Sequence, residues 1–230
     1  MKLLMNMNEE LIVHYITSDI HNNNEKFEEL IKRLNLKEAD KLYILGDLFD
    51  RSNYNPNPVD IYFNILKLGN KCQVIRGNHE QELAEYITAY LGRNERKNVK
   101  LDSYSYNSFE LLSERLTQVD LQNMAKWMLE LPLQIALEVD GTKYLLAHAM
   151  TSSTYEVCSD EYYLRGDGDF QSFLNHGIEE YISICGHSNP EGNVIWRNCK
   201  GNVIICDCGC GFQSGRLGCL CIETGEEIYV

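Results

Sequence analysis

The sequence predicts an α/β fold in which two mixed β-sheets pack as a sandwich flanked by helices. Strand-like and helical stretches alternate in the N-terminal half, hairpins dominate the C-terminal half, and polar motifs directly follow several strands. Alternation indicates a sheet with crossover helices, and hairpins add antiparallel strands. The 230 residues contain no internal repeat and no Pro- or Ser-rich linker, so we expect a single domain over residues 1–230.

The N-terminal half supplies strand–helix pairs. In the first helix, Phe27, Leu30, Ile31 and Leu34 recur at i, i+3, i+4 and i+7, which defines one apolar face. Asparagines at 22–24 are available to cap its first turn. The predicted strands are 11–17, 41–45 and 72–76, and the predicted helices are 22–35, 58–69 and 81–92.

The C-terminal half is richer in strands. A hairpin over 131–148 turns at Asp140-Gly141, a strong two-residue turn signal. A strand over 180–187 follows, and two more hairpins cover 193–209 and 216–230. The segment of about 81–130 is mostly helical and polar, so we expect it to be an insertion or cap.

Composition and charge limit the partners and the cellular location expected for the protein. The formal net charge is −13 and the pI is near 4.9, which argues against nucleic acid or an anionic membrane as partner. No apolar run is long enough to span a bilayer, and polar residues interrupt any signal-peptide core within 1–13. We therefore expect a cytoplasmic protein with reduced thiols. Bound cations would still let an acidic chain handle phosphate locally.

Five polar motifs, each after an apolar strand, carry the candidate chemistry. Ligands of α/β sheets collect at the carboxyl ends of the strands, so these motifs are expected to converge. Carboxylate, amide and imidazole groups without thiolate suit Mn, Fe, Zn or Mg. Six ligands are enough for two ions roughly 3.5–4 Å apart that share a carboxylate, for which Asp47 is the natural bridge. The candidate ligands are Asp19, His21, Asp47, Asn78, His148 and His187.

The order of these motifs resembles the calcineurin-like metallophosphoesterases, and within them the phosphoprotein phosphatase branch with its small bacterial and phage members. That family shows GDxHG, GDxxDRG, GNHE, HAG and GHT, where this chain has SDIHN, GDLFDRS, GNHE, HAM and GHS. The resemblance covers nearly the full length. Asn22 and Ser52 replace two family glycines, and Ala149-Met150 replaces Ala-Gly. These departures put substrate fit and rate in question, but none removes a candidate ligand.

The resemblance implies a role for each motif residue. Two divalent ions would provide a bridging hydroxide that attacks phosphorus in line. Mn is the metal expected, and Fe, Zn, Ni or Mg are the alternatives. His79 would protonate the leaving alkoxide, with Asp50 orienting its imidazole. Arg51, Asn78 and Arg165 would contact the phosphate oxygens.

The predicted function is that of a metal-dependent phosphomonoesterase acting on phosphorylated protein, as a Ser/Thr or broader-specificity phosphatase, or on a small phosphoester. A dinucleoside polyphosphate hydrolase of the diadenosine tetraphosphate type and a small-nucleotide phosphodiesterase are the alternatives. A non-catalytic scaffold is disfavoured because His79 and every candidate ligand are present. Oligomeric state is left open by the sequence.

Other residues attract a structural interpretation. His14 and His176 are expected to be structural, and Glu80 is either a support for the ligands or only an acid at a helix N-terminus. Five cysteines close the chain without C-x-x-C spacing, and an extended strand would point the first three to one face. We expect buried side chains packed between sheets. They are Cys206, Cys208, Cys210, Cys219 and Cys221.

Overall fold

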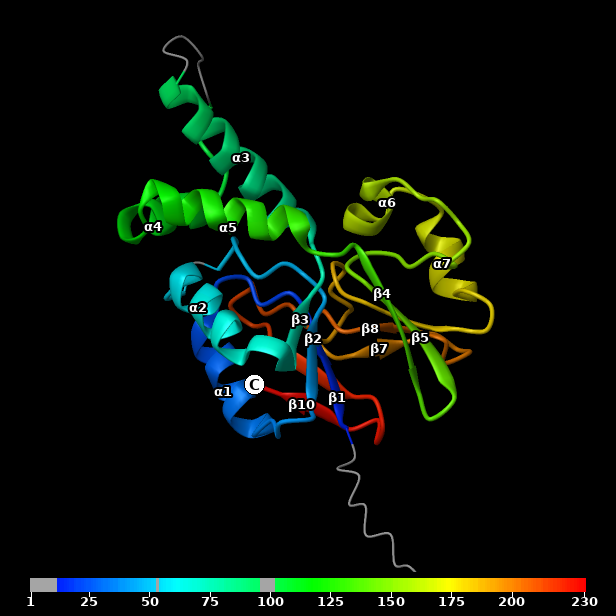
Figure 1. The fold of residues 1–230 in the computed structure, drawn as a ribbon. Helices are drawn as coiled ribbons and strands as arrows, with labels where there is room; N and C mark the ends of the chain where they lie inside the picture. The colour runs from blue at the N-terminus through cyan, green and yellow to red at the C-terminus, as the bar shows by residue number, and fades with distance from the viewer. Residues whose placement is uncertain (1–11, 53, 96–101) are drawn as a thin grey trace, which may run out of the picture.

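The computed structural model describes residues 12–52, 54–95 and 102–230. The signal-peptide argument on the first residues, the predicted strand position Leu11 and part of the expected insertion, 96–101, lie outside these ranges. Two five-stranded mixed sheets flanked by helices confirm the predicted fold class (Figure 1).

The first sheet has the strand order β10-β9-β1-β2-β3. β1, β2 and β3 are parallel, whereas β9 pairs antiparallel with both β1 and β10. The motifs after β1, β2 and β3 therefore emerge at one edge of this sheet. The strands are β1 (His14–Thr17), β2 (Lys41–Ile44), β3 (Cys72–Val74), β9 (Gly218–Cys221) and β10 (Glu227–Tyr229).

The second sheet has the order β4-β5-β6-β8-β7, with β5, β6 and β8 parallel. The β4–β5 hairpin turns at Asp140 and Gly141, whose φ angles of 49° and 77° are both positive, as the predicted turn requires. The strands are β4 (Gln134–Val139), β5 (Thr142–Ala147), β6 (Ile182–Cys185), β7 (Trp196–Arg197) and β8 (Val203–Ile205).

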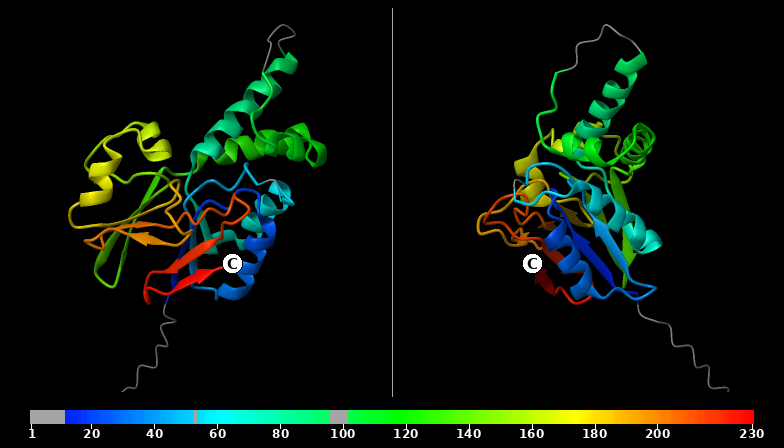
Figure 2. Two further views of the ribbon diagram at one scale, coloured as in Figure 1. Left: turned by 180° about the vertical axis from the view of Figure 1, so that it is seen from behind. Right: turned by 90° about the vertical axis from the view of Figure 1, so that its left-hand side faces the viewer.

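Helices cover the outer faces of both sheets. In Figures 1 and 2, α1 and α2 lie beside the first sheet, α6 and α7 lie on the side of the second, and α3 extends beyond the sheets. α3, α4 and α5 fall largely within the segment expected to be helical. The helices are α1 (Asn24–Leu34), α2 (Pro58–Leu68), the 3₁₀ turn η1 (Gly69–Lys71), α3 (Asn78–Glu95), α4 (Ser108–Arg115), α5 (Gln118–Glu130), α6 (Asp160–Arg165) and α7 (Phe170–His176).

Two helix starts show how local sequence sets these boundaries. Asn23 caps α1, its side chain accepting the backbone N–H of Lys26 at 3.2 Å, as expected for an Asn N-cap. α3 begins at Asn78, so the predicted start at residue 81 is wrong by one turn. The motif Asn78-His79-Glu80 forms that first turn.

Three apolar clusters hold the layers together. One packs the first sheet against α1–α5, with Phe27, Ile44 and Leu83 fully buried. The second lies between the sheets and joins residues such as Ile16 and Ile184. The third packs α7 and the segment near Met150 on the outer face of the second sheet.

The terminal cysteines are core residues, although their arrangement differs from the prediction. All five are free and buried. β8 ends at Ile205, so Cys206, Cys208 and Cys210 do not share one extended strand, and that prediction is wrong. Cys206 and Cys208 join the cluster between the sheets, whereas Cys210 joins the cluster under α1.

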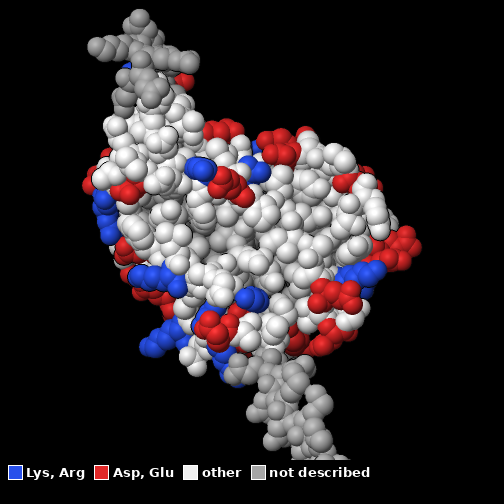
Figure 3. All heavy atoms as spheres, in the orientation of Figure 1, with Lys and Arg blue, Asp and Glu red and all other residues white. Residues whose placement is uncertain are grey.

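No membrane-spanning helix is found in the part of the chain that the structure describes. Its helices are each too short or too polar to cross a bilayer. On the face drawn in Figure 3, acidic and basic side chains lie mostly toward the margins, and Lys and Arg form no single continuous patch among the described residues.

Candidate metal centre and catalytic site

The loops after β1 and β2 are tied together by their backbones. Asp19 N–H donates to Gly46 O at 3.1 Å, His21 N–H to Asp47 O at 3.0 Å, and Asn22 N–H to Leu48 O at 2.8 Å. This ladder brings the side chains of Asp19, His21 and Asp47 to one point although they come from two segments.

Several site residues adopt the left-handed backbone conformation. The φ angles are 54° for Asp19, 48° for His21, 53° for Asp47, 69° for Asp50 and 64° for His187. Side chains other than glycine rarely adopt this conformation, and such residues cluster where function demands a particular geometry. The loops are therefore shaped to aim these side chains inward at a cost in local stability.

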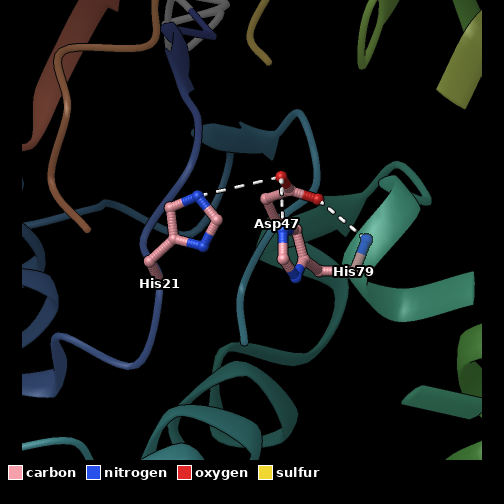
Figure 4. Close-up of side chains that lie close together, drawn as sticks. All are labelled: His21, Asp47 and His79. Carbon is pink, nitrogen blue, oxygen red and sulfur yellow. Dashed lines mark hydrogen bonds and ion pairs between the residues drawn. The ribbon is translucent and has the colours of Figure 1, made fainter. Parts of the chain in front are cut away.

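Asp47 presents its two carboxylate oxygens to two different groups of ligands. Oδ2 lies 3.7 Å from Nε2 of His21, which is also 3.6 Å from Oδ1 of Asp19. Oδ1 lies 3.3 Å from Nε2 of His148. Figure 4 shows the carboxylate of Asp47 between His21 and His79. One carboxylate thus faces two groups of possible ligands, and the bridging role of Asp47 stays a prediction.

The second group of ligands gathers around His148. Its Nε2 lies 3.1 Å from Oδ1 of Asn78 and 3.1 Å from Nδ1 of His187. Nδ1 of His148 lies 2.7 Å from the carbonyl oxygen of Leu45, which favours the tautomer that leaves Nε2 free to bind a metal. Nδ1 of His21 has the same kind of partner, Phe49 O at 2.9 Å.

The donor atoms fit divalent metal ions. Asp19 Oδ1, Asp47 Oδ2 and His79 Nε2 are buried without a hydrogen-bond partner among the described residues. Unpaired buried polar atoms are costly unless an ion satisfies them. Two overlapping sets of possible ligands share Asp47: one with His21 and His79, the other with His148 and His187. All six predicted ligands thus lie in one cluster.

Close packing of charge perturbs the titration of these groups. Burial alone would raise the pKa of Asp47, but His148, His79 and His21 hold this pKa well below its ordinary value. Burial would lower the pKa of His148, but Asp47 and Asp19 raise it to about 10. Burial and the neighbouring His148 lower the pKa of His187 to about 4. Such opposed shifts are typical of functional sites.

His79 and Asp50 form a buried pair beside the cluster. Nδ1 of His79 lies 2.8 Å from Oδ2 of Asp50, and both side chains are fully buried. The backbone N–H of His79 donates to Asp47 Oδ1 at 3.1 Å, and its Nε2 lies 3.9 Å from Asp47 Oδ2. Position alone would allow Nε2 either to bind a metal or to donate a proton, so the proton-donor role of His79 stays a prediction.

Comparison with known proteins identifies the family. Residues 14–206 match the calcineurin-like phosphoesterase family, a span that includes every predicted site residue. This chain belongs to the calcineurin-like phosphoesterases. Enzymes of this family hydrolyse phosphoester bonds and use divalent metal ions.

The phosphoesterase is similar to proteins with different substrates. It is 27% identical to the symmetrical bis(5'-nucleosyl)-tetraphosphatase of Salmonella paratyphi A over 145 residues, 62% of this chain and 45% of that relative. The chain thus aligns with less than half of its curated relative. A solved structure of a candidate diadenosine tetraphosphatase has a TM-score of 0.64 at 18% identity, covering 95% of this chain and 92% of that one. A protein serine/threonine phosphatase of Saccharomyces cerevisiae has a TM-score of 0.61 at 16% identity, covering 93% and 73%. Both structural matches establish the fold alone.

The two arginines predicted to bind phosphate differ in their surroundings. Arg51 Nη1 lies 3.3 Å from Nε2 of His21, so its guanidinium adjoins the metal cluster. Arg165 pairs with Glu82 of α3 at 2.6 Å, a contact that links α6 to α3, and with Glu161 of its own helix at 2.9 Å. The phosphate role of Arg165 stays a prediction.

Asn22, which replaces a family glycine, is accommodated in the loop after β1. Asn22 has a φ of 61°, and asparagine tolerates this region better than most residues. Its side-chain amide donates to Ser108 Oγ at 2.9 Å and to Asn107 Oδ1 at 3.2 Å. Asn22 therefore links the loop after β1, which carries Asp19 and His21, to the start of α4.

Glu80 supports the loop that carries Asp47, a role the sequence left open. Its carboxylate accepts the backbone N–H groups of Asp47 at 2.8 Å, Leu48 at 2.8 Å and Gly77 at 2.9 Å. A Cβ at Gly77 would lie 2.4 Å from Asp47 Oδ1, so only glycine allows this approach. The GNHE motif thus holds the loop that carries Asp47 in place. Burial and Asp47 raise the pKa of Glu80 to about 7.

Aromatic residues from distant segments were missed by sequence reasoning. Tyr104 donates to Asp50 at 2.6 Å, and the Tyr106 ring packs edge-on against the His79 imidazole with centroids 4.8 Å apart. Tyr106 and Arg51 also line a pocket of about 1080 Å³. No spacing rule connects these tyrosines to Asp50, which lies more than 50 positions away. The other lining residues are Asn23, Lys26, Ser52, Tyr54, Ser105, Asn107, Cys210, Gly211, Phe212 and Gln213.

Proposed function

We propose that this phosphoesterase is a two-metal phosphomonoesterase that removes phosphate from phosphoserine or phosphothreonine in proteins. The observation that carries the proposal is the position of Asp47, whose two oxygens face separate ligand groups, with the His79–Asp50 pair beside them. A single tetrahedral ion would not need six such ligands.

The metal pair is proposed to be Mn²⁺, with Fe, Zn, Ni or Mg as alternatives. Asp19, His21 and Asp47 would hold one ion, and Asp47, Asn78, His148 and His187 the other. When bound, two such cations neutralise phosphate charge and supply an acidified water as nucleophile.

The remaining residues bind and orient the substrate. Arg51 lies beside the cluster with donors free to pair with phosphate oxygens, for which the guanidinium fork is well suited. The amide of Asn78 would bind the same group. Charge on a transferring phosphoryl group spreads over its oxygens, so donors fixed in advance stabilise it.

His79 favours an alcohol as leaving group. An alkoxide is strongly basic and leaves readily only when it receives a proton, whereas a nucleotide phosphate leaves as a weak base. Nε2 of His79 faces the cluster while Asp50 holds Nδ1, which suits proton donation to the departing oxygen. This requirement supports a serine or threonine ester over a polyphosphate.

A dinucleoside polyphosphate is the second candidate substrate. Tyr54, Tyr106 and Phe212 line the pocket together with Lys26 and Arg51. Aromatic rings stack on nucleobases while cations pair with phosphates, and the relatives named above include tetraphosphatases. The pocket supports this reading independently of His79.

The choice is tested by assaying purified protein with Mn²⁺ on a phosphoserine peptide, a phosphothreonine peptide, para-nitrophenyl phosphate and diadenosine tetraphosphate. We expect kcat/KM to be highest for a phosphopeptide. A much higher kcat/KM for the tetraphosphate would overturn the phosphoprotein proposal in favour of the second candidate. His79→Asn is the catalytic control, and His176→Asn, in an exposed helix end, is the matched control.

We also propose that the enzyme works in the cytoplasm on phosphorylated protein or small phosphoesters, without nucleic acid or membrane partners. The net charge of −13 argues against a polyanion such as nucleic acid as partner. The nine free cysteines support a reducing compartment. Fractionation of cells expressing the protein would check its location.

A further inference from the structure

Tyr104, which precedes α4, reaches the His79–Asp50 pair. The hydroxyl of Tyr104 donates to Asp50 Oδ2 at 2.6 Å, and the same oxygen lies 2.8 Å from His79 Nδ1. One carboxylate oxygen therefore receives two donors, one from the predicted proton donor and one from the segment expected to be only an insertion.

Asp50 has no other described side-chain partner for its carboxylate. Its Oδ1 is buried without a hydrogen bond, and its backbone N–H donates to Ser108 Oγ at 2.7 Å. The same Ser108 Oγ accepts from Asn22. Residues 104–108 thus hold Asp50 from both its backbone and its side chain.

Tyr104 is itself held by packing. Its ring lies 5.0 Å from that of Tyr86 and 5.9 Å from that of Tyr106, measured between centroids. Burial and then the charge of Asp50 raise the pKa of the Tyr104 phenol above its ordinary value. The phenol therefore remains protonated as a hydrogen-bond donor.

We infer that Tyr104 is a positioning residue for the proton donor: through Asp50 it fixes the imidazole of His79 so that Nε2 faces the leaving oxygen. The inference rests on the proposed function. A carboxylate held by one donor can rotate about its Cβ–Cγ bond, whereas two donors on one oxygen fix its orientation. Small misplacements of a catalytic group cost large factors in rate.

The step itself leaves Tyr104 unchanged. The P–O bond to the substrate alcohol breaks with its electron pair remaining on oxygen, and the Nε2–H bond of His79 breaks as an O–H bond forms. Water supplies the new oxygen on phosphorus; one of its protons restores His79, and the other stays with the phosphate product. Tyr104 keeps its proton throughout. Its effect on the rate should therefore be large only for substrates whose leaving group needs a proton from His79.

The test compares Tyr104→Phe with the wild type on a phosphoserine peptide and on para-nitrophenyl phosphate, whose phenolate leaves without protonation. We expect kcat on the peptide to fall about tenfold, the size of a lost hydrogen bond to a charged group. On the nitrophenyl ester kcat should change by less than about twofold, and KM should hold on both substrates. Tyr90→Phe, which alters a tyrosine of α3 packed on Phe109 of α4, is the matched control.

A second readout does not depend on activity. In metal-free protein labelled with ¹⁵N-histidine, the Nδ1 proton of His79 should exchange with water faster in Tyr104→Phe than in the wild type or Tyr90→Phe. Thermal unfolding of each variant identifies any general loss of folding.

The outcomes separate the inference from the function it depends on. Equal losses on both substrates, or no loss on either, would overturn the role of Tyr104 while leaving the phosphomonoesterase intact. A wild type that hydrolyses neither monoester would overturn the proposed function instead, and the exchange measurement would still report whether Tyr104 orders His79.

Discussion

Nδ1 of His79 lies 2.8 Å from Oδ2 of Asp50 in a fully buried pair, and the backbone N–H of His79 donates to Oδ1 of Asp47. The residue predicted to donate a proton is thereby attached to the carboxylate predicted to bridge the metals. Any movement of the first turn of α3 would disturb both. The predicted proton donor and the predicted metal ligand Asp47 are therefore mechanically linked.

Replacing His79 should remove proton donation and leave the metals in place. We expect His79→Asn to lower kcat on a phosphoserine peptide at least about 100-fold, within the range of general acid catalysis, and to affect para-nitrophenyl phosphate less. Metal content by mass spectrometry should stay at that of the wild type and of His176→Asn. A loss of one metal equivalent would show that His79 is a ligand and would contradict its role as proton donor.

Replacing Asp47 should affect both metal positions at once. Because its two oxygens face separate ligand groups, Asp47→Asn should lower the metal content from two equivalents to below one and abolish activity. Asp102→Asn, on an exposed residue, should keep two equivalents. Retention of one tightly held ion in Asp47→Asn would argue against a shared carboxylate.

Removing the metals should destabilise the fold. Asp19 and Asp47 are fully buried, and a ligand that binds only the folded state at about 1,000 times its Kd adds about 4 kcal/mol. Chelation should lower Tm by roughly 10 °C, measured by calorimetry with and without Mn²⁺. The shift should nearly vanish in Asp47→Asn, and an equal shift in that variant would place the stabilising metal elsewhere.

Replacing Glu80 should loosen the Asp47 loop. Glu80→Gln exchanges one acceptor oxygen for an amide that faces backbone N–H groups of Asp47, Leu48 or Gly77. We expect a loss of about 2 kcal/mol in the free energy of unfolding, together with weaker metal binding, measured by denaturant titration and metal competition. Glu85→Gln, exposed in the same helix, should change neither, and identical behaviour of the two variants would refute the supporting role.

Replacing core cysteines should cost stability without affecting the metals. Cys208 and Cys219 lie in different apolar clusters, and burial raises the pKa of the Cys208 thiol to about 12, which disfavours thiolate as a ligand. Cys208→Ala combined with Cys219→Ala should lower the free energy of unfolding by about 1–3 kcal/mol and keep two metals per chain. A wild-type count above two that falls in this variant would show a cysteine site.

Much of the site was predictable because its residues sit in short motifs at strand ends. Asp19, His148 and His187 each follow a strand of one of the two sheets, and parallel strands deliver such residues to a common edge. The hairpin that starts the second sheet was also predictable, because its turn signal at Asp140-Gly141 is local in the sequence. The misplaced start of α3 arose because a functional motif occupies the first helical turn.

The residues that support the ligands were not predictable in the same way. Tyr104 meets Asp50 across 54 positions, and the role of Glu80 depends on a close approach that only Gly77 permits. Likewise, Cys206 and Cys210 alternate in the sequence, yet the chain leaves the strand at Ile205 and sends them to different clusters.

Residue types and their order along the chain were enough to indicate the fold class and the candidate ligands, since these follow from periodicity, turn signals and donor chemistry. The phosphoester chemistry was indicated by the resemblance of the five motifs to those of the calcineurin-like metallophosphoesterases. Tertiary structure decided which oxygen of Asp47 faces which ligands, what Glu80 holds, and that Tyr104 reaches Asp50. The reason is physical: orientation within a buried site is set by left-handed loops and by packing between distant segments, and neither leaves a local pattern in the sequence.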